Sequence, residues 1–179
     1  MVREALQVGE VDTGTADVFA NLDDVLEEDF RHPIPMGIPG IDNLLKGGMA
    51  KGELGVILAP TGVGKSTLLT KISNHAFNLG YNVLQIFFED NPKIIQRKHF
   101  TLWTEIAPDL LSLHKDKVMD KIKDIRENAP NKLILKKLPS DTLTMNQIKN
   151  QIRKMTAEGN KVDMVVLDYI DCVVPDKNL

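Results

Sequence analysis

Residues Ala59–Thr67 read Ala-Pro-Thr-Gly-Val-Gly-Lys-Ser-Thr, a set of residue types and spacings suited to binding phosphate. Loops of this kind have a Gly, four further residues and then Gly-Lys-Ser/Thr. The chain differs from that pattern only at its first position, where Ala59 stands in place of Gly. We predict that the loop binds a nucleoside triphosphate through Ala59, Pro60, Thr61, Gly62, Val63, Gly64, Lys65, Ser66 and Thr67.

Each part of this loop has a chemical reason to be present. Gly62 and Gly64 tolerate the backbone angles that let successive N–H groups turn toward an anion. Lys65 supplies a positive charge that can reach the β- and γ-phosphates, and the Ser66 hydroxyl can ligate Mg²⁺. A helix that starts directly after the loop directs its positive end at the same phosphates.

Two carboxylates follow apolar runs that read as strands. Glu89 follows the run 82–88, and Asp168 ends the run 162–168. Ligands gather at the carboxyl ends of strands in open α/β sheets. We therefore predict that Glu89 is a catalytic base that orients the attacking water, and that Asp168 holds Mg²⁺ through its water shell. The alternative is structural, because an acid in this position can simply cap the turn that follows the strand.

The elements that would position these residues alternate between strand and helix. Leu54–Leu58 is a short apolar run predicted as a buried parallel strand before the loop, and the helix after the loop is expected to end at Gly80. Thr144 and Gln147 form a capping box that opens another helix. The other expected elements are strands within 82–88, 132–138 and 162–168 and mostly helical structure over 93–128. This order predicts an α/β fold with a mostly parallel sheet flanked by helices.

Length and composition narrow the class of protein. With 179 residues, of which 42% are hydrophobic, the chain can bury the core of one α/β domain. Cys172 is the single cysteine, which excludes an intramolecular disulfide and favours a reducing compartment. No apolar run reaches the roughly 20 residues needed to cross a bilayer, and the N-terminus lacks the pattern of a secretory signal. We expect a cytoplasmic protein without membrane partners.

Charge divides the chain into two parts. Residues 1–31 hold nine acidic and two basic residues, so the rest of the chain is net positive although the whole carries −3. A basic excess is compatible with nucleic-acid binding, but a solvated lysine-rich surface is the better-supported explanation of it. An apolar stripe within 17–30 predicts a short acidic helix that packs either on its own domain or on a neighbouring subunit. We expect an acidic arm and linker helix at 1–32 and the nucleotide-binding core at 33–179.

The motifs together resemble the core of DnaB-like replicative DNA helicases, whose ATPase domains have the RecA-like P-loop fold. The resemblance is carried by Pro35–Asp42, Lys46–Leu54, the phosphate loop, Phe87–Glu89 and Val165–Ile170, in that order. It implies that ATP and Mg²⁺ bind, that Lys65 and Glu89 are catalytic, and that Ser66 and Asp168 form the metal site. It also implies a homo-hexamer that moves 5′ to 3′ on single-stranded DNA, with a primase or loader as further partner.

The resemblance also predicts parts that would follow Asp168: a strand with a polar sensor, DNA-binding loops and an arginine finger. Because the chain ends at Leu179, we expect an incomplete core, truncated after the second acidic strand and weakly active or inactive alone. The resemblance, which extends to helicases of phage type, implies that the protein acts in the cytoplasm of a cell or of an infected host. Two alternatives stay open, namely another RecA-like ATPase (a recombinase or clock-type ring protein) and a non-catalytic ATP-binding fragment.

Overall fold

The structure, a computed structural model, describes residues 18, 23, 26 and 31–175. The chain divides into two units, Met1–His32 and Pro33–Leu179, and the candidate site belongs entirely to the second. Most of the acidic helix predicted within 17–30 lies outside the described residues, so that helix stays a prediction.

Three parallel strands form the sheet of the second unit. They are β1 (Val83–Phe87), β2 (Leu133–Lys137) and β3 (Met164–Asp168), in the spatial order β2-β1-β3. Val83 of the central strand lies beside Leu133 on one side and Met164 on the other. Every residue of β1 is buried, as expected for a parallel strand covered on both faces. The strands predicted within 82–88, 132–138 and 162–168 are confirmed.

The helices alternate with these strands along the chain. They are α2 (Pro39–Leu44), α3 (Lys65–Asn78), α4 (Pro92–Thr104), α5 (Lys115–Asn128), α6 (Met145–Ala157) and a short 3₁₀ helix, η1 (Ile170–Cys172). The predicted capping box of α6 is present, with the Thr144 side chain accepting from Gln147 N and the Gln147 side chain accepting from Thr144 N. Gly80 follows the C-cap of α3 at a φ of +95°, where a residue without Cβ ends a helix most easily.

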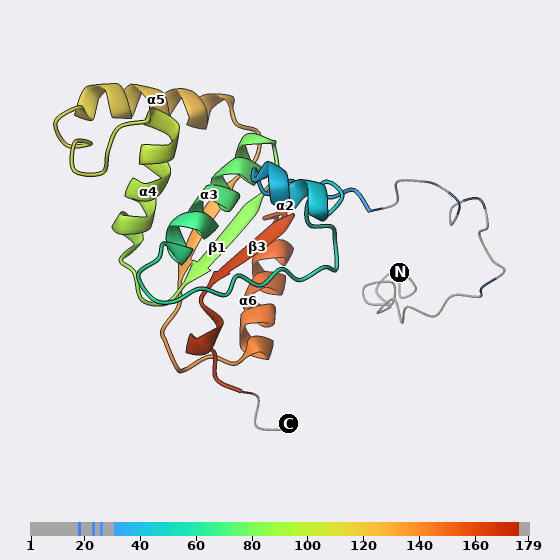
Figure 1. Cartoon of the computed structure of the whole chain (residues 1–179). Coiled ribbons are helices and arrows are strands. Elements are labelled where there is room, and N and C mark those ends of the chain that lie inside the picture. Colours follow the sequence, from blue (N-terminus) through green and yellow to red (C-terminus); the bar gives the residue numbers. More distant parts are fainter. Residues whose placement is uncertain (1–17, 19–22, 24–25, 27–30, 176–179) are drawn as a thin grey trace, which may run out of the picture. The chain divides into compact units, whose positions relative to one another are not determined.

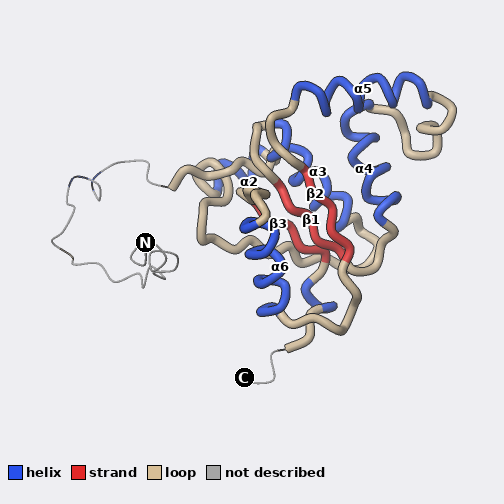
Figure 2. The backbone as a smooth tube through the Cα atoms, turned by 180° about the vertical axis from the view of Figure 1, so that it is seen from behind, coloured by secondary structure: helices blue, strands red, loops and turns tan. Residues whose placement is uncertain are grey.

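Helices cover both faces of the sheet (Figures 1 and 2). On one face Leu84, Ile86 and Phe88 form a core cluster with Ile148 of α6. On the other face Val83 and Val166 pack with apolar residues of α3, and Trp103 of α4 and Ile125 of α5 join that cluster. The predicted α/β architecture, a parallel sheet flanked by helices, is confirmed.

The face covered by α3 and α4 also contains a buried chain of polar side chains. His99 Nε2 donates to Gln85 Oε1 (3.0 Å), and Asn74 Nδ2 donates to His99 Nδ1 (3.3 Å). Gln85 Nε2 donates in turn to Thr70 Oγ1 (3.3 Å). Since each of these four side chains has a hydrogen-bond partner, the polar network joins α3, β1 and α4 at fixed positions rather than destabilising the core.

One predicted strand is wrong. Residues 54–58 have no strand structure, and the side chains of Leu54 and Leu58 are 84% and 89% exposed. A strand needs a neighbour for its backbone groups. Within the described part of the chain, β3 pairs only with β1, and no strand lies beside 54–58. The apolar composition indicated a tendency to form a strand, but pairing decides whether one forms.

Candidate functional site

The phosphate loop leads directly into the first turn of α3. Gly64 is the N-cap residue of this helix, with φ +97°, and Gly62 has φ +84°. Both angles lie in the left-handed region that favours glycine. No side chain caps the helix, so its first backbone N–H groups are not taken up by a capping oxygen. A loop with this backbone can present N–H groups and a helix end to a phosphate, as the sequence predicted.

Lys65 and Ser66 are the first two residues of α3. Ser66 is half-buried, and its carbonyl accepts a hydrogen bond from Thr70 Oγ1 (2.7 Å), which ties the first turn of α3 to the buried polar chain described above. Lys65 Nζ lies 5.4 Å from the centroid of the Tyr169 ring. Tyr169 directly follows Asp168, the last residue of β3, so the ammonium group of Lys65 lies near the carboxyl end of this strand.

The two predicted acids lie at the same edge of the sheet. Phe87, the last residue of β1, is in register with Asp168, the last residue of β3, and Glu89 follows β1 by two residues. Asp168 is buried at 7% exposure, whereas the Glu89 side chain is exposed. The parallel register brings both acids close to the start of α3, although they are 79 residues apart in the chain.

A small cavity of about 40 Å³ joins the predicted residues. Its lining residues are Ser66, Phe87, Glu89, Asp90, Asp168 and Tyr169. A single water needs roughly 10–15 Å³, so the cavity has room for a few waters. The cavity thus brings Ser66, Glu89 and Asp168 together. Residues Ala59–Lys65 do not line it, and their assignment depends on the loop geometry.

The oxygen donors of this cavity fit Mg²⁺, which prefers hydroxyl and carboxylate oxygens. Within the described residues, no cluster of three or more His, Cys, Asp or Glu side chains could hold a metal alone. One hydroxyl and one carboxylate are a chemically suitable donor set for Mg²⁺, because this ion keeps several waters and takes its other ligands from substrate phosphates.

The turn that carries Glu89 is held from two elements, β2 and α4. Lys137 at the end of β2 donates from Nζ to the Glu89 carbonyl (3.1 Å). Lys98 of α4 forms an ion pair with Asp90 (3.0 Å), and Asn91 caps α4 by accepting from Lys93 N (2.9 Å). These contacts hold the main chain of the turn in place after β1.

Tyr169 is the site residue that the sequence reasoning missed. Its hydroxyl donates to Glu89 Oε1 (2.7 Å). This hydrogen bond, followed by one involving Cys172, raises the pKa of Tyr169 well above its usual range. Tyr169 directly follows the predicted acid at the end of β3. Ligands of open α/β sheets bind at the carboxyl ends of strands, so the position of Tyr169 in the sequence could have identified it as a site residue.

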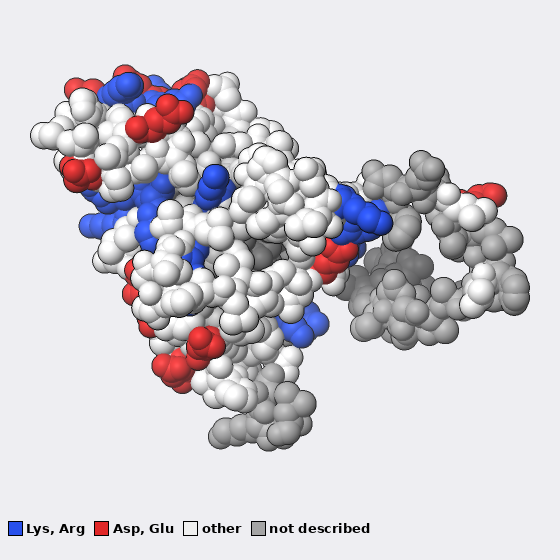
Figure 3. Space-filling view, viewed as in Figure 1, with Lys and Arg blue, Asp and Glu red and all other residues white. Residues whose placement is uncertain are grey.

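The polar residues early in α4 do not form one surface. His99 is buried, and burial lowers its pKa from 6.5 to about 4. Lys98 pairs with Asp90, and Arg97 donates to the Pro108 carbonyl. α4 contains basic residues and no acidic residue, whereas α5 mixes both, and Figure 3 shows both signs of charge over the α5 end of the molecule. Neither α4 nor α5 therefore offers a basic stripe that by itself identifies a nucleic-acid surface.

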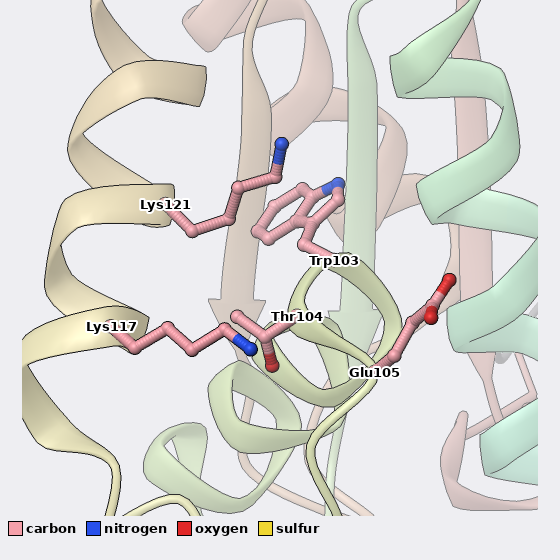
Figure 4. Close-up of a pocket in the computed structure, with 5 residues that line it drawn as sticks. All are labelled: Trp103, Thr104, Glu105, Lys117 and Lys121. Atoms are coloured by element: carbon pink, nitrogen blue, oxygen red, sulfur yellow. The ribbon is translucent and has the colours of Figure 1, made fainter.

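A wider and more open hollow lies between α4 and α5, with a volume of about 390 Å³ (Figure 4). Lys121 extends toward Trp103 and Lys117 toward Thr104, while the Glu105 side chain extends away. None of the predicted site residues lines this hollow.

Among the described helices, none is both long and apolar enough to cross a membrane.

A protein-family model and several known proteins match this chain. The model of the family described as "DnaB-like helicase C terminal domain" matches residues 33–178. The chain is 24% identical over 149 residues to the "DnaB-like replicative helicase" of Enterobacteria phage T4, an alignment that covers 76% of this chain and 30% of the relative. It is 26% identical over 163 residues to the "DNA repair protein RadA" of Rickettsia felis, covering 91% of this chain and 29% of that protein.

The chain thus spans less than a third of the length of the relatives it matches. The match to the family model covers most of the chain and contains the phosphate loop, Glu89 and Asp168. The parallel sheet with its flanking helices is consistent with a RecA-like P-loop domain. The chain belongs to the family of DnaB-like helicase C-terminal domains, which are RecA-like ATPases.

Proposed function

We propose that this chain is the ATPase core of a replicative DNA helicase. It binds ATP with Mg²⁺ and hydrolyses it, and the hydrolysis drives movement along single-stranded DNA. The observation that carries the proposal is the shared cavity of Ser66, Glu89 and Asp168 at the start of the helix that Lys65 begins. A hydroxyl, a candidate base and a buried acid at one sheet edge are the groups that γ-phosphate hydrolysis requires.

In this proposal each residue has one role. The loop from Ala59 to Thr67 binds the triphosphate, and Lys65 neutralises charge on the β- and γ-phosphates. Glu89 accepts a hydrogen bond from the attacking water and orients it in line with the bond that breaks. Ser66 and Asp168 would hold Mg²⁺, which when bound stabilises the charge that develops on the phosphate oxygens.

DNA binding and assembly are proposed from the family alone. A homo-hexamer on single-stranded DNA, with a primase or loader, is the arrangement that membership of the DnaB-like family suggests. We propose that the protein acts in the cytoplasm. Arg97 and Lys98 of α4 are used in internal contacts, so the proposal assigns them no contact with DNA.

A second candidate, a RadA-type DNA repair ATPase, is favoured by the alignment that covers 91% of this chain. The two functions share the ATP site and differ in the DNA reaction. Unwinding of a forked duplex in the presence of ATP supports the helicase, whereas DNA-stimulated ATP hydrolysis without unwinding favours the repair protein.

The site is tested by single-turnover hydrolysis of ATP with excess protein, which measures slow rates as well as fast ones. We expect Glu89→Gln to bind ATP as the wild type does and to hydrolyse it at least about 100-fold more slowly. Glu158→Gln, at an exposed position after α6, is the matched control and should hydrolyse at the wild-type rate. Equal rates in Glu89→Gln and the wild type would instead favour a non-catalytic ATP-binding module.

A further inference from the structure

Tyr169 contacts both residues to which the proposed function gives a catalytic role. Its hydroxyl donates to Glu89 Oε1 (2.7 Å), and its ring lies under Lys65 Nζ, 5.4 Å from the centroid. It also lines the cavity that contains Ser66 and Asp168. A single side chain therefore connects the base, the phosphate-binding lysine and the metal site.

The side chain of Tyr169 is the anchored member of this group. Its ring packs against the core cluster that contains Leu84 and Ile86. The main-chain carbonyl of Tyr169 accepts from the N–H of Cys172, the last residue of η1 (3.3 Å). Glu89, in contrast, is exposed. Because a flexible carboxylate bonded to an anchored phenol takes up the position that the phenol sets, the orientation of Glu89 follows from Tyr169.

The carboxylate of Glu89 has no second support among the described residues. Lys137 holds the main-chain carbonyl of Glu89 and not its side chain. The bond from Tyr169 is the one hydrogen bond that the Glu89 carboxylate accepts within the described part of the protein. A base must lie within hydrogen-bond reach of its water, and a displacement of about 1 Å can cost roughly 100-fold in rate.

We propose that Tyr169 is a positioning residue. It fixes the Glu89 carboxylate in the orientation from which Glu89 directs the water that attacks ATP. The inference rests on the proposed function of Glu89 as the base. Glu89 has two carboxylate oxygens, so Oε1 can accept from Tyr169 while Oε2 faces the attacking water. The proton of the Tyr169 hydroxyl stays on the phenol throughout, and Tyr169 takes part in no bond that forms or breaks.

Tyr169→Phe is the decisive substitution, because it removes the hydroxyl and keeps the ring beside Lys65. We expect the affinity for ATP to stay within about twofold of the wild type, while the single-turnover rate of hydrolysis falls by about 10- to 100-fold. Tyr81→Phe is the matched control, since Tyr81 packs with Phe77 and Val83 in the other core cluster. This control should change neither quantity.

A spectroscopic measurement tests the contact itself without turnover. The chain contains two tyrosines, so isotope labelling of the tyrosine rings gives two sets of signals, which Tyr81→Phe assigns. Because the Tyr169 hydroxyl donates to Glu89 Oε1, Glu89→Ala removes the acceptor and should shift the ring signals of Tyr169 at neutral pH, while those of Tyr81 stay in place. Tyr169 signals that are unchanged by Glu89→Ala would overturn the inference.

The ATP-binding role of Lys65 and the positioning role of Tyr169 can be tested separately. If Lys65→Ala binds ATP as tightly as the wild type, the proposed function is wrong. If Lys65→Ala loses ATP but Tyr169→Phe hydrolyses bound ATP at the wild-type rate, only the inference on Tyr169 is wrong. A wild-type rate no faster than that of Glu89→Gln would overturn the inference as well, because there would be no base for Tyr169 to position.

Discussion

Asp168 at the end of β3 lies in register with Phe87 at the end of β1, and both residues line the cavity that Ser66 and Glu89 also face. The register of a parallel pair thus sets the spacing between the proposed metal residue and the proposed base. Neither acid needs a long loop to reach the other, because the carboxyl ends of neighbouring parallel strands meet at one edge.

The first prediction concerns Asp168 and Mg²⁺. Replacing Asp168 with Asn keeps the size of the side chain and removes its charge, so the affinity for ATP in the presence of Mg²⁺ should fall by about tenfold. Affinity measured with a chelator should change little. Asp171→Asn, an exposed acid three residues later, is the control. Equal Mg²⁺ dependence in the wild type and Asp168→Asn would argue for a purely structural Asp168.

The second prediction follows from the buried histidine of α4. The neutral form of His99 suits its partners, with Nε2 donating to Gln85 and Nδ1 accepting from Asn74. Burial lowers the pKa of His99 from 6.5 to about 4, so between these pH values the unfolded chain binds a proton that the folded chain does not. The free energy of unfolding should therefore fall, by up to about 3 kcal/mol, as the pH drops from 6.5 to 4.

The measurement is chemical denaturation across this pH range. His99→Gln should be less stable than the wild type at neutral pH, because the buried contacts change, and should lack the part of the pH dependence that His99 supplies. If the difference in unfolding free energy between wild type and variant is the same at both ends of the range, His99 is not the titrating group.

The third prediction separates the observed structure of 54–58 from the strand expected there. Leu58 is 89% exposed, so Leu58→Ala should change the free energy of unfolding by less than about 0.5 kcal/mol. Leu84→Ala, at a fully buried position in β1, is the matched comparison and should cost about 2–5 kcal/mol. A comparable loss at both positions would mean that residue 58 is buried after all.

The fourth prediction concerns the capping box of α6. Thr144→Ala removes the oxygen that accepts from Gln147 N, and the loss of such a cap costs about 1 kcal/mol. Thr142→Ala, in the preceding turn, leaves the box intact. Denaturant titration of both variants measures the difference, and equal stabilities would show that the cap adds little to this helix.

The sequence predicted the elements whose local pattern agrees with their surroundings. The strand that ends before Glu89, the strand that ends at Asp168 and the cap at Thr144 are read from neighbouring residues, and each is present. Leu54–Leu58 was predicted wrongly because a strand depends on a partner that local composition does not report. Tyr169 was missed because its role depends on contacts with residues 80 and 104 positions away, which appear only when the sheet edge and α3 come together.

The measurement that tests the central claim most directly is the affinity for ATP of the wild type, Lys65→Ala and Lys71→Ala. Both substitutions remove a lysine from α3, but only Lys65 lies at the start of the helix beside the proposed phosphate site, and Lys71 is exposed. The account predicts a loss of at least about tenfold in Lys65→Ala and an unchanged affinity in Lys71→Ala. Equal affinity in all three proteins would contradict the assignment of Ala59–Thr67 as the ATP-binding loop.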